Sequence, residues 1–244
     1  MQKEISVIVP IHNDADVISG TIDSILDFFN KENLDGELIV VNDGGTKEGV
    51  EIVENKIKNG SNVIFISRNI NKGKGYSVKE GIEKSTGEVT IFTDADLPYG
   101  TESIKKIYEK IFGNEFDFVL ANRNLSGKQG MKQATMVRKI AHAVYSLFAG
   151  SLMLNFSDVS AGLKGMNRKV VEAVMPKITI NRFAFDIELI LLVKKFGFRI
   201  GEIPVVLQQI GKSKNLSVIF DSPQMIFDVL KIVLRNWFGF YKDL

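Results

Sequence analysis

The amino-acid sequence predicts an α/β fold with a mostly parallel central sheet that helices cover on both faces. Five apolar runs have the length of strands and are rich in β-branched residues: Ile5–Pro10, Glu37–Val41, Val63–Ser67, Val89–Thr93 and Phe116–Ala121. Between them lie segments whose apolar residues recur at helical spacing: Asp14–Phe29, Thr46–Asn59, Gly75–Ser85 and Thr101–Ile111. Strands that are apolar almost throughout, alternating with amphipathic helices, are typical of a parallel sheet buried on both faces.

The segments that follow these strands contain chemically distinctive residues. They are Pro10 to Asp14, Asn42 to Gly45, Arg68 to Gly75 and Asp94 to Asp96. In open α/β sheets, ligands bind in the crevice outside the carboxyl ends of the strands. The sequence therefore predicts a binding site at this edge of the sheet.

Asp94 and Asp96 are the most informative pair, because two carboxylates one residue apart follow a buried strand. Carboxylates suit a hard divalent cation, which takes oxygen ligands and usually shares them with a substrate diphosphate. The alternative is that both side chains begin an exposed loop and cap the helix that starts near Thr101. The spacing alone does not separate these two interpretations.

Composition limits the class of function. Of the 244 residues, 45% are hydrophobic and 25% charged, which allows one large or two small globular domains with a full core. A formal charge of +2 is too small to indicate bulk binding to nucleic acid. The absence of cysteine excludes a disulfide framework, thiolate catalysis and a cysteine zinc site, and it indicates a reducing compartment. His12 and His142 are the only histidines and lie far apart, which argues against a zinc hydrolase.

Short motifs along the chain resemble those of the inverting family 2 glycosyltransferases of GT-A fold. These motifs are Ser6–Pro10 with His12–Asp14, Val40–Gly44, Asn71–Gly75 and Thr93–Asp96. The later part of the chain is similar to the polyprenyl-phosphate sugar synthases, and to the dolichyl-phosphate glucosyltransferases more than to the mannosyl enzymes. The segments that carry this second resemblance are Asn122–Arg123, Arg138, Asp158–Gly162, Phe185–Glu188, Gly201–Val205 and Gly211–Lys214.

The resemblance implies a nucleotide diphosphate sugar as donor, with a UDP sugar favoured. It places Pro10, His12 and Asp14 in the pocket for the base, and it implies that Asp43 accepts a hydrogen bond from the base. The alternatives are a turn residue for Asp43 and a loop residue without a ligand for His12. The family usually has Tyr or Phe at position 12, Asp at position 42 and Glu at position 14. These departures concern the identity of the nucleotide more than the reaction.

The chemistry of such a donor suggests roles for three more side chains. The diphosphate is a poor leaving group until its charge is neutralised, and Mg2+ or Mn2+ held by Asp96 would act on it as a Lewis acid. Asp94 would reach the ribose or a metal-bound water. Lys74 opens a helix, where free amides and the helix dipole favour anions, so it could meet the donor phosphate or ribose. A simple helix entry is the alternative for Lys74.

Basic residues predict the site of the acceptor. Arg123, Arg138 and Lys214 could hold a second phosphate close to an already anionic donor. A phosphate monoester is substantially ionised near neutral pH, so its oxygen can attack without a general base, provided that it is aligned with the leaving diphosphate. The alternative is that Asp158 or another carboxylate deprotonates an alcohol acceptor. Surface salt bridges are the other interpretation of the basic residues.

The C-terminal part predicts a helix that begins at Ser222 and Pro223. Polar residues at helical spacing form one narrow stripe, and the remaining positions are apolar and end in aromatic residues: Gln224, Asp228, Lys231 and Arg235 in the stripe, then Trp237, Phe238, Phe240 and Tyr241. The segment is too short and too charged to span a bilayer. It could lie in the membrane interface, or it could pack against the catalytic domain or a subunit partner of a homo-oligomer.

These observations together predict a metal-dependent, inverting glycosyltransferase that moves a hexose or N-acetylhexosamine onto a polyprenyl or dolichyl phosphate. Residues 1–216 would form the glycosyltransferase domain, with a nucleotide-sugar half at 1–123 and an acceptor half at 124–216, followed by the helical segment 217–244. We expect a cytoplasmic protein, peripheral on the cytoplasmic face of the membrane, because no apolar signal segment precedes the first strand. The alternatives are a sugar or other alcohol as acceptor, and a non-catalytic nucleotide-sugar-binding protein.

Overall fold

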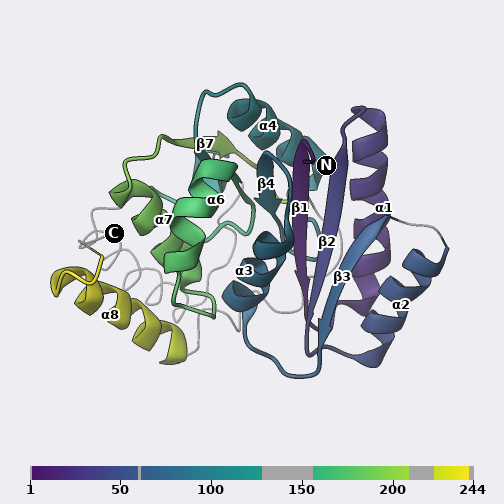
Figure 1. Ribbon diagram of the computed structural model, residues 1–244, viewed down its shortest axis with the longest axis horizontal. Coiled ribbons are helices and arrows are strands. Elements are labelled where there is room, and N and C mark those ends of the chain that lie inside the picture. Colours follow the sequence, from purple (N-terminus) through teal and green to yellow (C-terminus); the bar gives the residue numbers. More distant parts are fainter. Residues whose placement is uncertain (1, 60–61, 128–155, 209–222, 242–244) are drawn as a thin grey trace.

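The computed structural model describes residues 2–59, 62–127, 156–208 and 223–241, and it confirms the predicted α/β class (Figure 1). The strands are β1 (Ile5–Ile11), β2 (Gly36–Asp43), β3 (Val63–Arg68), β4 (Val89–Phe92), β5 (Phe118–Asn122), β6 (Lys164–Asn167) and β7 (Ile200–Pro204). The helices are α1 (Ala15–Lys31), α2 (Lys47–Lys58), α3 (Lys74–Lys84), α4 (Gly100–Phe112), α6 (Arg168–Val174), α7 (Phe185–Lys195) and α8 (Pro223–Trp237), with short 3-10 helices η1 (Arg123–Ser126) and η3 (Met175–Lys177).

The seven strands form one sheet in the order β3-β2-β1-β4-β6-β5-β7. Neighbouring strands are parallel except where β6 lies antiparallel between β4 and β5. The sequence predicted the first five strands to within about two residues at each end, whereas β6 and β7 were not predicted. The structure therefore adds an antiparallel strand directly beside β4, the strand that precedes Asp94 and Asp96.

Alternate residues of the central strands enter two separate cores, one on each face of the sheet. Ile8 of β1 packs on the face that α3, α6, α7 and α8 cover, and Val7 and Val9 pack on the face that α1, α2 and α4 cover. Because successive side chains of a strand point to opposite faces, burial on both faces requires an apolar residue at almost every position. This requirement explains the uninterrupted apolar runs in the sequence.

The helix α8 lies against the body of the protein near α7 (Figure 1). Val229, Ile232 and Val233 are buried and belong to the same core as α7. The buried and exposed faces of α8 differ from the expectation that its polar stripe faces solvent, because Asp228 of that stripe is buried. The face left to solvent is apolar: Ile226, Phe227, Leu230 and Leu234, followed by Trp237, Phe238 and Phe240. Within the described ranges, no helix is both long and apolar enough to cross a membrane.

Candidate active site

The carboxyl ends of the parallel strands β1, β2 and β4 bring the predicted donor-binding residues to one edge of the sheet. Pro10 is part of β1, which His12 and Asp14 follow. Asp43 ends β2, and Asp94 and Asp96 come directly after β4. The parallel register therefore brings these residues together from stretches of sequence that lie far apart.

Asp43 organises the loop that precedes α3. Its carboxylate accepts hydrogen bonds from Nε and Nη2 of Arg68, at 3.1 and 2.7 Å. It also accepts the backbone amides of Lys72 and Gly73, at 2.7 and 2.9 Å. With only 4% of its surface exposed, Asp43 has the contacts of a loop-organising residue. These bonds connect Asp43 to the loop between β3 and α3 and not to its own turn at Gly44 and Gly45, so both its contact with a base and the turn alternative stay predictions.

His12 and Asp14 form a small cluster beside this loop. His12 Nδ1 lies 2.9 Å from the carbonyl oxygen of Asp43, and the His12 amide donates to Oδ2 of Asp14 at 2.7 Å. Burial raises the pKa of Asp14 above its usual value. These contacts hold the segment after β1 against the segment after β2, which is the arrangement that a shared nucleotide pocket needs.

Lys74, the first residue of α3, forms an ion pair with Asp94. Burial would raise the pKa of Asp94, but the charge and hydrogen bond of Lys74, with the charges of Lys164 and Arg123, hold it below the usual value. Asp94 also packs so closely on Gly162 that a Cβ at position 162 would overlap its carboxylate. In the sequence, Gly162 belongs only to a motif, and its close contact with Asp94 appears in the structure alone.

Asp96 has a different environment from Asp94. Burial and the charge of Asp94 raise the pKa of Asp96 to about 6. The next residue, Leu97, has a φ of +47°, a left-handed conformation that is rare for a branched side chain. Such backbone strain concentrates at functional sites, where surrounding structure holds it in place. Asp96 is therefore a carboxylate whose charge the folded protein disfavours, which is the condition that a bound cation relieves.

Arg123 follows β5 and is held by Asp158. Its Nε and Nη2 donate to the two carboxylate oxygens of Asp158 at 2.7 Å each, and Nη2 also donates to Ser160 at 2.8 Å. Burial would raise the pKa of Asp158, but these bonds and the charge of Arg123 keep it below the usual value. A carboxylate with a lowered pKa is a weak base, so the structure does not favour Asp158 as the general base for an alcohol acceptor.

Lys164 and Asp186 form a buried ion pair that the sequence did not predict. Lys164, at the start of β6, is fully buried; its Nζ lies 2.7 Å from Oδ1 of Asp186 and donates to the carbonyl of Ala161 at 2.6 Å. Burial lowers the pKa of Lys164. The pair lies within electrostatic reach of both Lys74 and Asp94. The sequence contains a signal for this pair, since Lys164 and Asp186 each interrupt a mostly apolar stretch.

Arg138 and Lys214, the other two residues predicted to bind the acceptor phosphate, lie outside the described residues. Among residues 2–59, 62–127, 156–208 and 223–241, no group of three or more His, Cys, Asp or Glu side chains could hold a metal ion by itself. Magnesium and manganese ions in nucleotide sites need fewer protein ligands, because one or two carboxylates and the substrate phosphates complete their coordination. The donor set of Asp94 and Asp96 fits that kind of site.

The fold and the polar strand ends are those of an α/β protein that binds a ligand at the carboxyl edge of its sheet. The chain belongs to the glycosyl transferase family 2, whose model matches residues 6–175. Curated relatives extend over nearly the whole chain. A dolichyl-phosphate beta-glucosyltransferase of Dictyostelium discoideum is 28% identical over 98% of this chain and 76% of the relative. The enzyme of the same name from Saccharomyces cerevisiae is 24% identical over 98% of this chain and 77% of the relative.

Solved structures show the same fold. The glucosyl-3-phosphoglycerate synthase of Mycobacterium tuberculosis, in complex with Mn2+, UDP-glucose and phosphoglyceric acid, superposes with a TM-score of 0.65. It is 17% identical, and the match covers 95% of this chain and 80% of that enzyme. The protein is therefore a glycosyltransferase of GT-A fold, as the motifs predicted.

Proposed function

We propose that this glycosyltransferase moves a hexose or N-acetylhexosamine, with glucose favoured, from a UDP sugar to a polyprenyl or dolichyl phosphate, with inversion. The observation that carries the proposal is the similarity along 98% of the chain to enzymes named dolichyl-phosphate beta-glucosyltransferases. The site supports the proposal, because the charges of Lys74 and Arg123 both lower the pKa of Asp94, so two cations lie near the carboxylates that follow β4. A site that binds two phosphorylated substrates needs such cations to offset their mutual repulsion.

The residues present fit a divalent cation, Mg2+ or Mn2+, held by Asp96 with support from Asp94. Burial and the charge of Asp94 raise the pKa of Asp96, whereas Lys74 holds the pKa of Asp94 below its usual value, so Asp96 is the carboxylate whose charge a bound cation would stabilise more. When bound, such a cation would neutralise the charge that develops on the departing nucleotide diphosphate. The nearby Lys74 would then share the same task on the donor side.

The protein's own residues would act mainly by position and charge. The segments after β1 and β2 would hold the nucleotide, and Arg123, braced by Asp158 and Ser160, would face the acceptor phosphate from the end of β5. Because the acceptor oxygen is already ionised, no general base is required, and the weak basicity of Asp158 agrees with this chemistry. Alignment of the acceptor oxygen with the leaving diphosphate supplies the rate enhancement.

A panel of nucleotide sugars tests the proposal. Release of nucleotide is measured with Mn2+, Mg2+ or EDTA, with and without a short-chain polyprenyl phosphate. We expect metal-dependent release of UDP that rises when the lipid phosphate is added and is greatest with UDP-glucose. Release that responds to a sugar or a phosphorylated alcohol, and not to the lipid phosphate, would support an alcohol acceptor. Binding without turnover on every acceptor would support a non-catalytic role.

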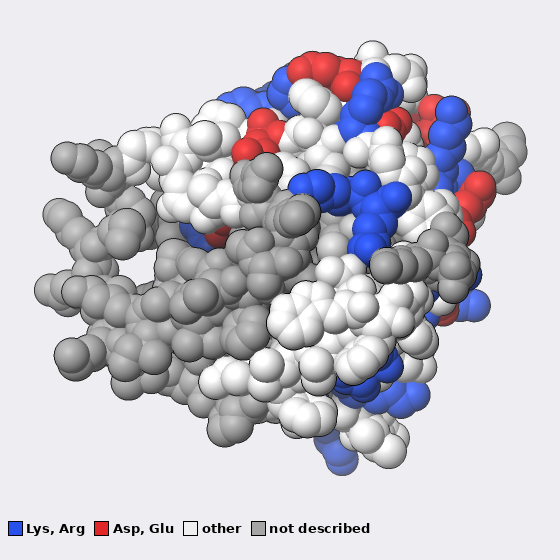
Figure 2. Space-filling view, turned by 90° about the vertical axis from the view of Figure 1, so that its left-hand side faces the viewer, with Lys and Arg blue, Asp and Glu red and all other residues white. Residues whose placement is uncertain are grey.

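We also propose that α8 places the enzyme on the cytoplasmic face of a membrane, where a polyprenyl phosphate resides. On its solvent face, Trp237 is 67% and Phe238 85% exposed. The side of the molecule that carries α8 shows a broad uncharged area bordered by Lys and Arg side chains (Figure 2). Exposed aromatic residues with cations at their edge are typical of helices that lie in the membrane interface. A second copy of the chain could cover the same face.

Point substitutions test the membrane proposal better than truncation, because Val229, Ile232 and Val233 of α8 belong to the core. Trp237→Ser with Phe238→Ser should weaken binding to phosphatidylcholine–phosphatidylglycerol vesicles by roughly tenfold or more per side chain, since each contributes about 1.5–3 kcal/mol when buried. Phe112→Ser, at an exposed position of α4, is the matched control. Equal sedimentation of all three proteins, or a dimer that the double variant dissociates, would contradict membrane contact.

A further inference from the structure

Glu188 of α7 is a fully buried carboxylate that the predicted chemistry does not use. It accepts hydrogen bonds from the backbone amides of Thr179 and Ile180, at 2.8 and 2.7 Å, and from the hydroxyl of Thr179 at 2.6 Å. A buried charge is costly unless it is paired and hydrogen-bonded. These bonds therefore tie the segment 178–182 firmly to α7.

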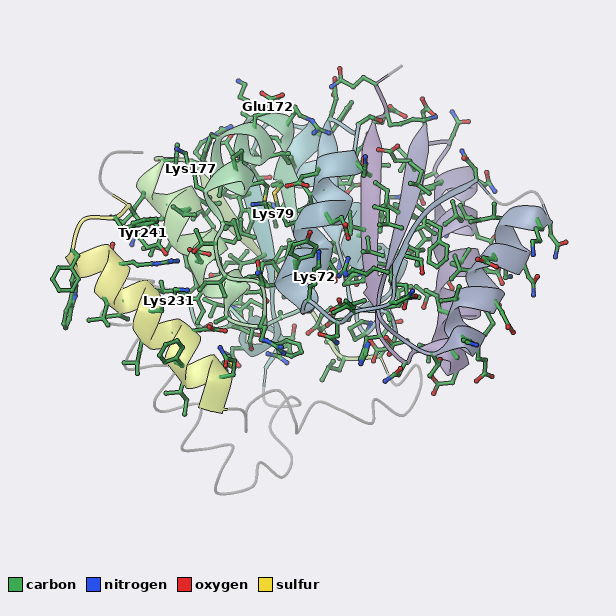
Figure 3. The ribbon with its side chains drawn as sticks, turned by 60° about the horizontal axis from the view of Figure 1, so that its bottom comes forward. Lys72, Lys79, Glu172, Lys177, Lys231 and Tyr241 are labelled. Atoms are coloured by element: carbon green, nitrogen blue, oxygen red, sulfur yellow. The ribbon has the colours of Figure 1, made fainter. Side chains whose placement is uncertain are left out.

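The fourth donor to Glu188 comes from the end of the chain. Tyr241, which follows α8, donates its hydroxyl to Oε1 of Glu188 at 2.6 Å. Figure 3 shows Tyr241 between the C-terminal end of α8 and the body of the protein. Arg235 of α8 donates to the Thr179 hydroxyl, and its Nη1 lies 4.0 Å from Glu188. Two side chains of the C-terminal region thus meet at one carboxylate.

The segment 178–182 in turn packs on the amino end of α3. The carbonyl of Asn181 accepts the amide of Tyr76 at 2.9 Å, and the carbonyl of Ile178 accepts Nζ of Lys79 at 3.2 Å. Gly73 approaches so closely that a Cβ there would lie 2.6 Å from the Asn181 oxygen, and its φ of +101° also disfavours any larger residue. The start of α3 is therefore set between Asp43 on one side and this segment on the other.

The residue placed by this arrangement is Lys74, which begins α3 and pairs with Asp94. We propose that Glu188 is a positioning residue: it joins the C-terminal region, through Tyr241, to the segment 178–182 and so sets Lys74 against Asp94 in the donor site. The inference rests on one part of the proposed function, namely that the site at the strand ends binds a nucleotide diphosphate. Through this chain of contacts, Glu188 would connect helix α8 to the ion pair of Lys74 and Asp94 in the donor site.

A double-mutant cycle between Tyr241 and Lys74 tests this linkage, because the two residues are not in direct contact. Tyr241→Phe removes one hydroxyl donor and keeps the ring, and Lys74→Met removes the cation. The affinity for UDP with Mn2+ is measured by calorimetry. We expect Tyr241→Phe to weaken it by roughly 2- to 30-fold, the usual range of coupling through packed contacts. In the Lys74→Met background the same substitution should have no further effect.

Hydrogen exchange provides a readout that needs no ligand. The amide of Tyr76 donates to Asn181, so Tyr241→Phe and Glu188→Gln should both speed its exchange, whereas amides of α4 should be unchanged. Tyr108→Phe, at another buried tyrosine, on α4, is the matched control and should change neither the affinity nor the exchange.

Additive effects of Tyr241→Phe and Lys74→Met, with unchanged exchange at Tyr76, would show that Tyr241 and Glu188 form a local structural contact and would overturn the inference. If the parent protein does not bind UDP with Mn2+, the proposed function is what fails. The exchange at Tyr76 still decides the linkage in that case, so the two failures are distinguishable.

Discussion

The carboxyl ends of β2 and β4 both place aspartates at the same edge of the sheet, yet these aspartates have different surroundings. Asp43, the last residue of β2, receives four hydrogen bonds, two from Arg68 and two from the backbone of the loop between β3 and α3. Asp96 after β4 stands in a partly buried place where its pKa rises to about 6. The charge of Asp43 is compensated by donors within the fold, whereas the fold disfavours the charged form of Asp96.

This difference shows how the protein separates stability from function. Hydrogen bonds and an ion pair to a buried carboxylate stabilise the fold around it. A carboxylate that is desolvated beside another carboxylate costs stability, and functional sites commonly carry such a cost. Asp94 is intermediate, because Lys74 compensates its charge while Gly162 holds it in place.

The largest expected effect is that of Asp96→Asn on turnover. Loss of the ligand charge should lower kcat roughly 10²- to 10³-fold, the size seen when one electrostatic stabiliser is removed. The melting temperature at pH 8 should not fall, because above pH 6 the folded protein disfavours the Asp96 charge that the amide removes. Asp27→Asn, at an exposed position of α1, is the control. Near-normal turnover would remove Asp96 from the metal site.

Asp43→Ala, unlike Asp96→Asn, should lower the stability of the fold. Loss of the carboxylate leaves the amides of Lys72 and Gly73 without their acceptor and removes one partner of Arg68, which keeps Glu80 and Ser77. This loss should lower the free energy of unfolding by about 2 kcal/mol. Urea denaturation measures the change. Asp23→Ala, which breaks an exposed pair with Lys56, should cost less than about 1 kcal/mol. Equal stability losses in the two variants would contradict the organising role of Asp43.

Gly162→Ala should disturb Asp94 without removing a charge. A Cβ at this position would overlap the Asp94 carboxylate, and a displacement of about 1 Å can lower the rate roughly 10²-fold. Steady-state kinetics with a melting curve separate this effect from unfolding. Gly20→Ala, at an exposed position of α1 with open space around it, should have no kinetic effect. Unchanged kinetics in Gly162→Ala would show that the Asp94 position is not critical.

The smallest effect concerns pH. Because the pKa of Asp96 is about 6, a proton occupies this carboxyl below pH 6 and must leave before a cation binds. The affinity for Mn2+ with UDP should therefore fall by up to about tenfold for each pH unit below 6 and level off above it. Calorimetry across this range measures the profile. The Asp96→Asn variant should not show this step, and an identical step in that variant would assign the proton to another group.

Sequence reasoning located the early strands and helices well, because their signal is local. Burial on both faces forces apolar residues into β1, β2 and β4, and the helical period appears between them. The short strand β6 had no such signal: its four residues, Lys164 to Asn167, include a lysine and a glycine. The lysine is tolerated in the core only because Asp186, from a distant helix, lies 2.7 Å away.

The same distinction applies to the site. The motifs placed Pro10, His12, Asp14, Asp43, Asp94 and Asp96 at strand ends, and the parallel register brings them to one edge. Their individual roles depend on partners from elsewhere in the chain. Arg68 and the loop amides satisfy Asp43, Lys74 pairs with Asp94, and Asp158 braces Arg123. No spacing in the sequence indicates which of these charges remains unsatisfied.

By itself, the sequence determined the α/β class, the strand-end loops and the family, because apolar periodicity and short motifs are properties of neighbouring residues. Only the tertiary structure decided which carboxylate is neutralised and which face of α8 meets solvent. It also decided that Glu188 receives donors from both Thr179 and Tyr241. The physical reason is that burial and ion pairing are set by contacts between distant segments, and these exist only once the sheet and its helices have packed.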